Sequence, residues 1–163
     1  MIKLMFLCTG NSCRSQMAEG LAGELGRGLI EARSAGVRPA GTVQPRAVLV
    51  MQELGIDITR QTSKPIDESL LKTMDIIITL CSDADKSCPK TPPEIRRLHW
   101  PIDDPSGIRG TEQEIMDAFR TARDRIREKI AELIEDIKSN PEAVIKTTNT
   151  FTLTQGTGDK KND

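Results

Sequence analysis

The segment of the chain best suited to chemistry is the loop Cys8-Thr9-Gly10-Asn11-Ser12-Cys13-Arg14, which separates an apolar run from a helical pattern. A loop between a strand and a helix directs several backbone N–H groups to one point, and the helix N-terminus adds positive potential. Arg14 can bind two oxygens of a tetrahedral oxyanion, and this environment favours a Cys8 thiolate. The Cys-x5-Arg spacing alone is weak and fits a buried structural cysteine, but its placement favours an anion-binding nucleophile.

Other residues of this loop suit the same role. Gly10 lets the backbone approach a ligand closely, and Asn11 suits a backbone position with positive φ. The hydroxyl groups of Ser12 and Ser15 can donate to the Cys8 sulfur or to the anion. We therefore predict that residues Thr9, Gly10, Asn11, Ser12, Cys13, Arg14 and Ser15 bind the substrate.

Two more cysteines, Cys81 and Cys88, follow a second buried strand pattern. Because carboxyl ends of parallel strands share one edge of a sheet, Cys81 is expected at the same edge as Cys8. If residues 82–87 are helical, the Cα atoms of Cys81 and Cys88 lie about 10 Å apart. A disulfide needs Cα atoms within roughly 7 Å, so a Cys81–Cys88 bond requires this polar segment to unwind. The segment is thus a candidate redox switch.

Two alternatives for this pair remain open from the residues alone. In the first, Cys81 is a small buried residue and Cys88 is an exposed residue without a function. In the second, Cys81, Cys88 and His99 bind zinc. No Cys-x2-Cys spacing supports a zinc site. We therefore predict no metal site.

The segment Asp103-Asp104-Pro105 supplies a candidate acid. Expelling oxygen from an oxyanion requires a proton donor, and Pro105 fixes Asp104 in a rigid turn. Asp103 is the alternative donor. Taken alone, the sequence fits a plain Asp-Pro turn, and only the anion-binding loop elsewhere gives it catalytic meaning.

The elements that must position these residues follow from hydrophobic periodicity. Residues 2–7 and 75–80 form apolar runs typical of buried parallel strands, and residues 31–34 and 97–100 are weaker strand candidates. A helix is predicted from Met17, Leu21 and Leu25, with Gly26 as a stop. A second helix is predicted to begin at Pro45 and to turn Val48, Met51 and Leu54 inward, and a short third helix covers residues 67–73. A capping box of Thr111 and Glu114 starts a long amphipathic helix that reaches Ile137.

This order predicts an α/β fold of three layers, in which a small four-stranded parallel sheet has helices on both faces. We expect a single domain over residues 1–140. Residues 141–163 form a polar tail that is expected to be disordered, although residues 150–154 alternate as an edge strand would.

Composition limits the partners of the protein. The chain has 163 residues, 23 basic and 24 acidic, and a net charge of −1, so no electrostatic footprint for nucleic acid or a membrane surface is present. The apolar N-terminus is too short for a membrane span and lacks a cleavage site, which predicts a cytoplasmic protein. Structural disulfides are rare there, so the four cysteines point to catalysis, redox chemistry or metal binding. We expect a monomer.

Together, these residues resemble the thioredoxin-coupled arsenate reductases, which share the low-molecular-weight protein tyrosine phosphatase fold. The resemblance covers about residues 2–138 and is carried by three blocks in order: Phe6–Gly20, Thr79–Asp85 with Cys88-Pro89, and His99-Trp100 with Asp103–Pro105.

The resemblance implies the following mechanism. Arsenate binds in the loop, Cys8 attacks arsenic, and Asp104 protonates the departing oxygen. Cys81 then attacks Cys8, arsenite leaves, and Cys88 moves the disulfide to Cys81–Cys88, which reduced thioredoxin reopens. Arg14 and Asp104 complete the catalytic set, Cys13 has no role in this scheme, and no bound cofactor is expected.

One departure from the family concerns potassium, which some members bind beside this loop. Asn11, Glu19 and Ser34 match that site, but Lys64 stands near the place of a further acidic ligand. The lysine ammonium can replace the ion, so no potassium site is predicted.

Two rival functions differ in what they require. A phosphotyrosine phosphatase would use Cys8, Arg14 and Asp104 but would not need Cys81 and Cys88. The absence of Tyr, with three Phe and one Trp, argues against aromatic walls for such a substrate, although weak phosphatase side activity is expected. A non-catalytic thiol sensor for arsenite or zinc would leave the anion-binding loop unexplained.

Overall fold

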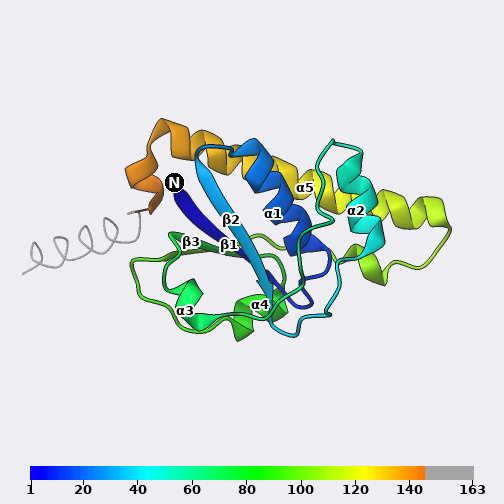
Figure 1. Cartoon of the computed structure of the whole chain (residues 1–163), viewed down its shortest axis with the longest axis horizontal. Coiled ribbons are helices and arrows are strands. Elements are labelled where there is room, and N and C mark those ends of the chain that lie inside the picture. Colours follow the sequence, from blue (N-terminus) through cyan, green and yellow to red (C-terminus); the bar gives the residue numbers. More distant parts are fainter. Residues whose placement is uncertain (146–163) are drawn as a thin grey trace, which may run out of the picture.

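The computed structural model describes residues 1–145, and its centre is a four-stranded parallel sheet in the order β2-β1-β3-β4. Every neighbouring pair of strands is parallel, as the sequence predicts. The strands are β1 (Ile2–Cys8), β2 (Ile30–Gly36), β3 (Ile76–Thr79) and β4 (Arg96–His99) (Figure 1).

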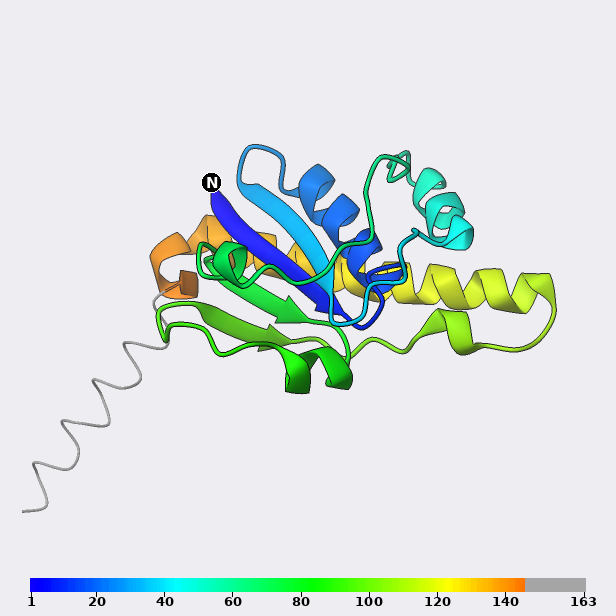
Figure 2. The ribbon, with the colours of Figure 1, turned by 60° about the horizontal axis from the view of Figure 1, so that its bottom comes forward.

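Helices cover both faces of this sheet, which confirms the predicted three layers (Figure 2). One face packs against α1 (Arg14–Leu25), α2 (Pro45–Gln52) and α5 (Glu112–Ser139). The other face packs against α3 (Glu68–Leu71) and α4 (Ser82–Ser87). A short 3₁₀ helix, η1 (Pro105–Gly107), precedes α5.

From Leu4 to Cys8, β1 is buried on both of its faces, whereas Lys3 is exposed. Leu4 and Phe6 pack in the core beneath α1 and α5, whereas Met5 and Leu7 pack in the core beneath α3 and α4. Successive side chains of a strand point to opposite faces, so a strand covered on both sides needs apolar residues at every position. This burial fixes β1, and the end of β1 carries Cys8.

Helix ends also agree with the sequence. α1 ends before Gly26, and α5 begins with the predicted capping box, in which the Thr111 hydroxyl accepts from the Glu114 N–H. The predicted inward face of α2 is confirmed: Met51 is buried, and the half-buried Val48 and Leu54 pack against the same core. Ala47 and Val50 are buried as well. The helix packs against α1 and α5, and it ends at Gln52.

Packing continues beyond residue 140, where the sequence places the end of the domain. Val144 is buried against the main core, and the Arg96 guanidinium donates to its carbonyl at 2.8 Å. The rest of the predicted tail, including the strand candidate at 150–154, lies outside the described residues.

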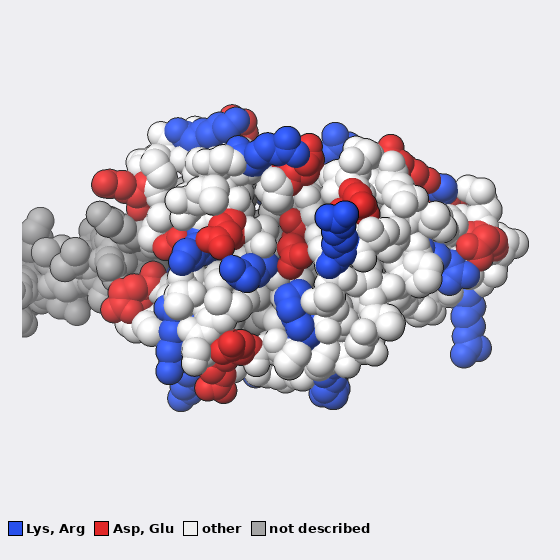
Figure 3. Space-filling model, in the orientation of Figure 1, with Lys and Arg blue, Asp and Glu red and all other residues white. Residues whose placement is uncertain are grey.

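Within residues 1–145, no helix is both long enough and apolar enough to cross a membrane. On the face of the molecule shown in Figure 3, basic and acidic side chains alternate over the surface and no large patch of one sign is visible.

Candidate active site

The loop after β1 lies at the point where the chain order of the sheet reverses, because β2 and β3 pair with opposite sides of β1. Ligands of open α/β sheets bind at such a switch point, outside the carboxyl ends of the strands. The register aligns Cys8 with Gly36 of β2 and Leu7 with Thr79 of β3. The segments that follow these strands therefore surround Cys8.

The Cys8 sulfur is buried and lies 2.9 Å from the hydroxyl oxygen of Ser15. The same Ser15 oxygen accepts a hydrogen bond from the Asn11 amide at 2.7 Å. Because the Asn11 amide donates to the Ser15 oxygen, the Ser15 hydroxyl proton is free to point at the Cys8 sulfur. The arrangement suits a Cys8 thiolate, which accepts hydrogen bonds. Of the two predicted serine donors, Ser15 has this contact.

The hydroxyl of Ser12 instead accepts from the Gln44 amide at 3.2 Å, and the Ser12 carbonyl accepts from the Gln44 N–H at 2.8 Å. Ser12 thus attaches the loop to the start of α2. Its predicted contact with the Cys8 sulfur is not among the hydrogen bonds of the described residues.

Asn11 has a φ of 48°, as its residue type predicts for this position. It is fully buried, and its side-chain oxygen accepts from the Lys64 N–H at 3.0 Å. Its carbonyl accepts from the Gln16 amide at 2.9 Å. These bonds hold the loop in its turn, so its shape is set before any anion binds.

Gly36, at the end of β2, is a site residue that sequence reasoning missed. A Cβ atom there would lie 2.8 Å from the Thr9 carbonyl oxygen and 2.9 Å from the Asn11 nitrogen. Only glycine therefore lets β2 pass this close behind the loop. At Gly10 a Cβ atom would make only ordinary van der Waals contacts with the protein. The predicted reason for glycine there is therefore the close approach of a ligand.

Arg14 begins α1 and is held in place from the side of the predicted acid. Its guanidinium donates to the Ile102 carbonyl at 2.9 Å and lies 3.7 Å from an oxygen of Asp104. The other Asp104 oxygen accepts from the N–H of Ser106 at 3.0 Å and from its hydroxyl at 2.6 Å. Of the two candidate acids, Asp104 rather than Asp103 therefore lies next to Arg14, and so next to the place where Arg14 is predicted to bind the anion.

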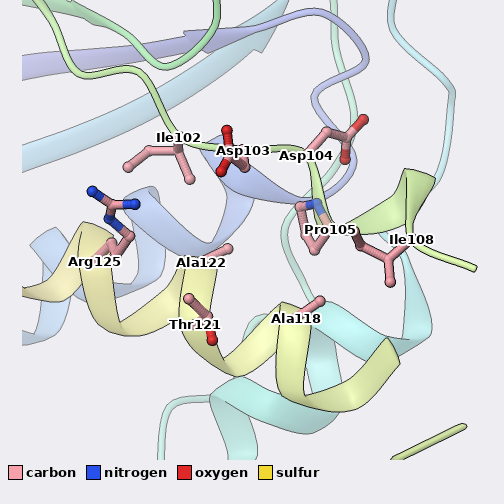
Figure 4. Close-up of a pocket in the computed structure, with 9 residues that line it drawn as sticks. All are labelled: Ile102, Asp103, Asp104, Pro105, Ile108, Ala118, Thr121, Ala122 and Arg125. Atoms are coloured by element: carbon pink, nitrogen blue, oxygen red, sulfur yellow. The ribbon is translucent and has the colours of Figure 1, made fainter. Parts of the chain in front are cut away.

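A cleft of about 260 Å³ joins Arg14 and Asp104 to Cys81. A separate hollow of about 190 Å³ lies between the segment of residues 102–108 and α5, where Ala118 and Ala122 present small side chains (Figure 4). The Asp104 carboxylate points away from α5 in this view. Asp104, the predicted acid, is thus carried by a segment with open space beneath it, and it lines the cleft.

Cys81 lies beside the loop, as the parallel sheet predicts. Its sulfur is 3.3 Å from the hydroxyl of Thr9 and accepts from the N–H of Ala84 at 3.4 Å. It directly precedes α4, and Cys88 directly follows that helix. The segment between the two cysteines is thus helical, the case in which a Cys81–Cys88 disulfide requires unwinding.

The two remaining thiols are electrostatically different from a catalytic thiolate. Burial, with a smaller contribution from Asp104, raises the pKa of the Cys13 thiol far above its ordinary value. Cys13 therefore stays protonated inside the loop, where a thiol does not compete with Cys8 as a nucleophile. Burial also raises the pKa of Cys88, whose S–H donates to the Pro89 carbonyl at 3.6 Å. While α4 is folded, Cys88 is a poor nucleophile.

Behind the loop, a polar chain runs from Asn11 to Lys64. The Asn11 amide donates to Ser34 at 3.0 Å, and Ser34 donates to Glu19 at 2.9 Å. The Lys64 ammonium lies 3.7 Å from that Glu19 oxygen. The Lys64 ammonium thus stands beside Glu19, at the place where the sequence predicts that a lysine takes the place of a bound ion. Among residues 1–145, no three His, Cys, Asp or Glu side chains are grouped to hold a metal ion.

Comparison with known proteins places this geometry in a family. Residues 3–143 match the model of the low molecular weight phosphotyrosine protein phosphatases. The chain belongs to this family. Within it, the chain is similar to an arsenate reductase of Bacillus subtilis, with 47% identity over 132 residues that cover 81% of this chain and 94% of the relative.

Solved structures of the family include both activities. An arsenate reductase in a phosphate-binding state has 39% identity and a TM-score of 0.69, and the match covers 84% of this chain and 99% of the other. A low molecular weight protein tyrosine phosphatase from T. tengcongensis has 28% identity and a TM-score of 0.69, with coverage of 83% and 99%. The shared fold therefore agrees with both chemistries.

Proposed function

We propose that this protein reduces arsenate to arsenite, with Cys8 as the nucleophile and Cys81 and Cys88 as the exit route for the resulting disulfide. The observation that carries the proposal is the contact between Thr9 and Cys81, which puts a second thiol at the rim of the anion-binding loop. A phosphatase needs no thiol there. The similarity to curated arsenate reductases supports the same substrate.

In the first step, the Cys8 thiolate attacks arsenic, an S–As bond forms, and an oxygen leaves with a proton from Asp104. Arg14 and the backbone N–H groups of the loop hold the remaining oxygens. The Ser15 hydroxyl, 2.9 Å from the Cys8 sulfur, stabilises the thiolate before attack. Arg14, 3.7 Å from Asp104, joins the anion to its acid.

In the second step, the Cys81 thiolate attacks the Cys8 sulfur. The S–As bond breaks, its electron pair stays on arsenic, and As(V) becomes As(III), which leaves as arsenite. Cys88 then attacks Cys81, and Cys8 leaves as a thiolate. A dithiol of the thioredoxin type reduces the Cys81–Cys88 disulfide and is itself oxidised. Because α4 separates Cys81 from Cys88, this transfer includes unwinding of α4, which also releases Cys88 from its half-buried position.

A coupled assay tests the proposal. Arsenate, thioredoxin, thioredoxin reductase and NADPH should together give sustained NADPH oxidation, and the signal should vanish in Cys8→Ser, Cys81→Ser and Cys88→Ser. Cys13→Ser is the matched control, because this buried thiol stays protonated, and it should keep substantial activity. Many turnovers by Cys88→Ser would refute the relay, and replacement of thioredoxin by glutaredoxin tests the choice of reductant.

A weak phosphatase activity is proposed as a second function, because the loop, Arg14 and Asp104 suit phosphate as well as arsenate. The solved arsenate reductase in a phosphate-binding state favours it. Hydrolysis of p-nitrophenyl phosphate should be lost in Cys8→Ser and retained in Cys81→Ser and Cys88→Ser. Loss in Cys81→Ser would show that Cys81 also shapes the anion site.

A further inference from the structure

The short helix α4 has few attachments to the rest of the molecule. It has 6 residues, and its buried residue is the small Ala84. A helix of this length is not stable by itself, so its contacts with the sheet decide how often it unwinds. Asp83 in its first turn forms an ion pair with Arg38 at 2.9 Å. Asp85, in the middle of the helix, contacts the sheet itself, and no step of the proposed reaction uses it.

Asp85 is linked to the ends of two strands. One of its carboxylate oxygens accepts from the Thr79 hydroxyl at 3.0 Å, and the same hydroxyl oxygen lies 2.8 Å from Nδ1 of His99. Thr79 and His99 end β3 and β4 and are paired in register. Thr79 is buried, and the further contact of its hydroxyl, with the Leu98 carbonyl, is longer at 3.4 Å. A chain of hydrogen bonds thus runs from the edge of the sheet to α4.

The positions of the protons in this chain follow from what each group can donate. An ionised carboxylate only accepts hydrogen bonds, so Thr79 donates its single proton to Asp85. The Thr79 oxygen then accepts from His99, which requires a proton on Nδ1 of the ring. The same Nδ1 lies 4.0 Å from the Asp85 carboxylate. His99 therefore orients the Thr79 hydroxyl with its proton toward α4.

We propose that Asp85 is a positioning residue that anchors α4 to the sheet through Thr79, with His99 orienting the bond. The part of this anchor in catalysis rests on the proposed function. While the anchor holds, α4 stays helical and Cys88 stays half-buried. When the disulfide moves to Cys81–Cys88, the Asp85–Thr79 bond breaks and water takes the place of the hydroxyl at the carboxylate.

The anchor keeps the two outgoing thiols apart until this transfer. In a folded α4 the Cα atoms of Cys81 and Cys88 lie about 10 Å apart along the helix axis, whereas a disulfide needs roughly 7 Å. A reduced protein with α4 folded therefore cannot close this disulfide, whatever oxidant is present. The strength of the anchor sets the fraction of molecules in which Cys88 can reach Cys81.

The first experiment measures how fast iodoacetamide alkylates Cys88 in the reduced Cys8→Ser protein, where the reaction reports opening of α4. Trypsin cleaves after Lys86, which separates Cys81 from Cys88 for mass spectrometry. Because a hydrogen bond to a charged group is lost, Thr79→Val should speed the alkylation of Cys88 by about five- to tenfold. Thr79→Ser keeps the hydroxyl and should stay within about twofold of the parent rate.

A second set of variants separates the anchor from other effects of charge. Asp85→Ala should be as fast as Thr79→Val, and Thr79→Val/Asp85→Ala should be no faster than either, because one bond is lost in all three. Burial is the main cause that raises the pKa of Cys88 and the Asp85 charge adds to it, but Thr79→Val leaves that charge in place. Glu94→Ala removes an exposed acid between α4 and β4 and should change the rate by less than about twofold.

The second experiment reads the proton of His99 directly. His99 is the one histidine of the chain, so a long-range ¹H–¹⁵N NMR spectrum holds a single imidazole. At about pH 8.5, above the range in which histidine changes charge, the wild type and Thr79→Ser should show the Nδ1–H tautomer. Thr79→Val should no longer hold the ring in this form.

Several results would overturn the proposal. An Nε2–H tautomer in the wild type would mean that the Thr79 proton points at His99 rather than at Asp85. Unchanged alkylation of Cys88 in Thr79→Val, or a double variant in which the two effects multiply, would show that the bond does not hold α4. Equal acceleration by Glu94→Ala would assign the effect to charge alone. Neither experiment needs arsenate or thioredoxin, so failure of the anchor is distinct from failure of the proposed function in the coupled assay.

Discussion

Gly36→Ala gives the sharpest test of how the loop is positioned. The added Cβ atom would lie 2.8 Å from the Thr9 carbonyl oxygen and 2.9 Å from the Asn11 nitrogen. Both are backbone atoms of the loop, so they cannot rotate away as a side chain would. Relief requires a shift of several tenths of an ångström between β2 and the loop, and overpacking of this kind costs about 1–3 kcal/mol of stability.

The effect on turnover should exceed the effect on folding. Misplacement of reacting groups by 1 Å can cost about 100-fold in rate, so a shift of about half that size should lower kcat by about tenfold. Gly23→Ala is the control. Gly23 is an exposed position of α1 where an added Cβ meets nothing within 4 Å, so this change should stabilise the protein by about 0.5–1 kcal/mol and leave turnover unchanged.

Urea unfolding and the coupled arsenate assay measure the two effects separately. The reasoning is refuted if Gly36→Ala unfolds with a free energy within about 0.5 kcal/mol of the wild type, the range of neutral surface changes, and turns over normally. A stable variant with a lower kcat would instead show that β2 moves and carries the loop with it.

Other predictions concern charges away from the reacting atoms. Burial raises the pKa of Cys13 above 9.0, so the folded state keeps a proton that the unfolded chain loses as pH rises. Stability should therefore fall above pH 9 by up to about 1.4 kcal/mol per pH unit from this group, and urea titrations should show a shallower fall in Cys13→Ser. Hydrogen bonds from Arg120 and then Arg123 lower the pKa of Glu53 from 4.5 to about 2, so its stabilisation is present above pH 4.5 and lost as pH falls through about 2. Thermal unfolding of Glu53→Gln should depend less on pH in that window, and equal dependence would contradict the ion pair. Because the Lys64 ammonium lies 3.7 Å from a carboxylate behind the loop, replacement of choline chloride by potassium chloride should leave turnover unchanged, and marked stimulation would show that potassium binds there nonetheless.

Hydrophobic periodicity predicted the elements that carry the site because burial acts on single elements. The apolar run at residues 2–7 predicted β1, and the steps of three and four that end at Ile137 predicted α5. The parallel order then placed Cys81 near the loop after β1. These inferences need only the period of an element and the general geometry of parallel sheets.

Features that depend on two distant segments did not follow from the sequence. Gly36 is required by its distance to Thr9, and that distance exists only once β2 pairs with β1. The contact of Arg38 with Asp83 likewise joins residues 45 positions apart. The full burial of Ala47 and Val50 likewise did not follow from the sequence, because the partners of α2 are other helices and their crossing decides how deeply each side chain is buried.

The position of the two ends of the described chain has a practical consequence. Ile2 begins β1, and Val144 lies beside Arg96 at the start of β4, so both are on the side of the sheet away from the loop (Figure 2). β1 and β4 are two strands apart, about 10 Å in a regular sheet. A glycine-rich linker of about five residues could join them. A circular permutant reopened at the exposed Arg109 would then begin with α5 and leave every cysteine in its place.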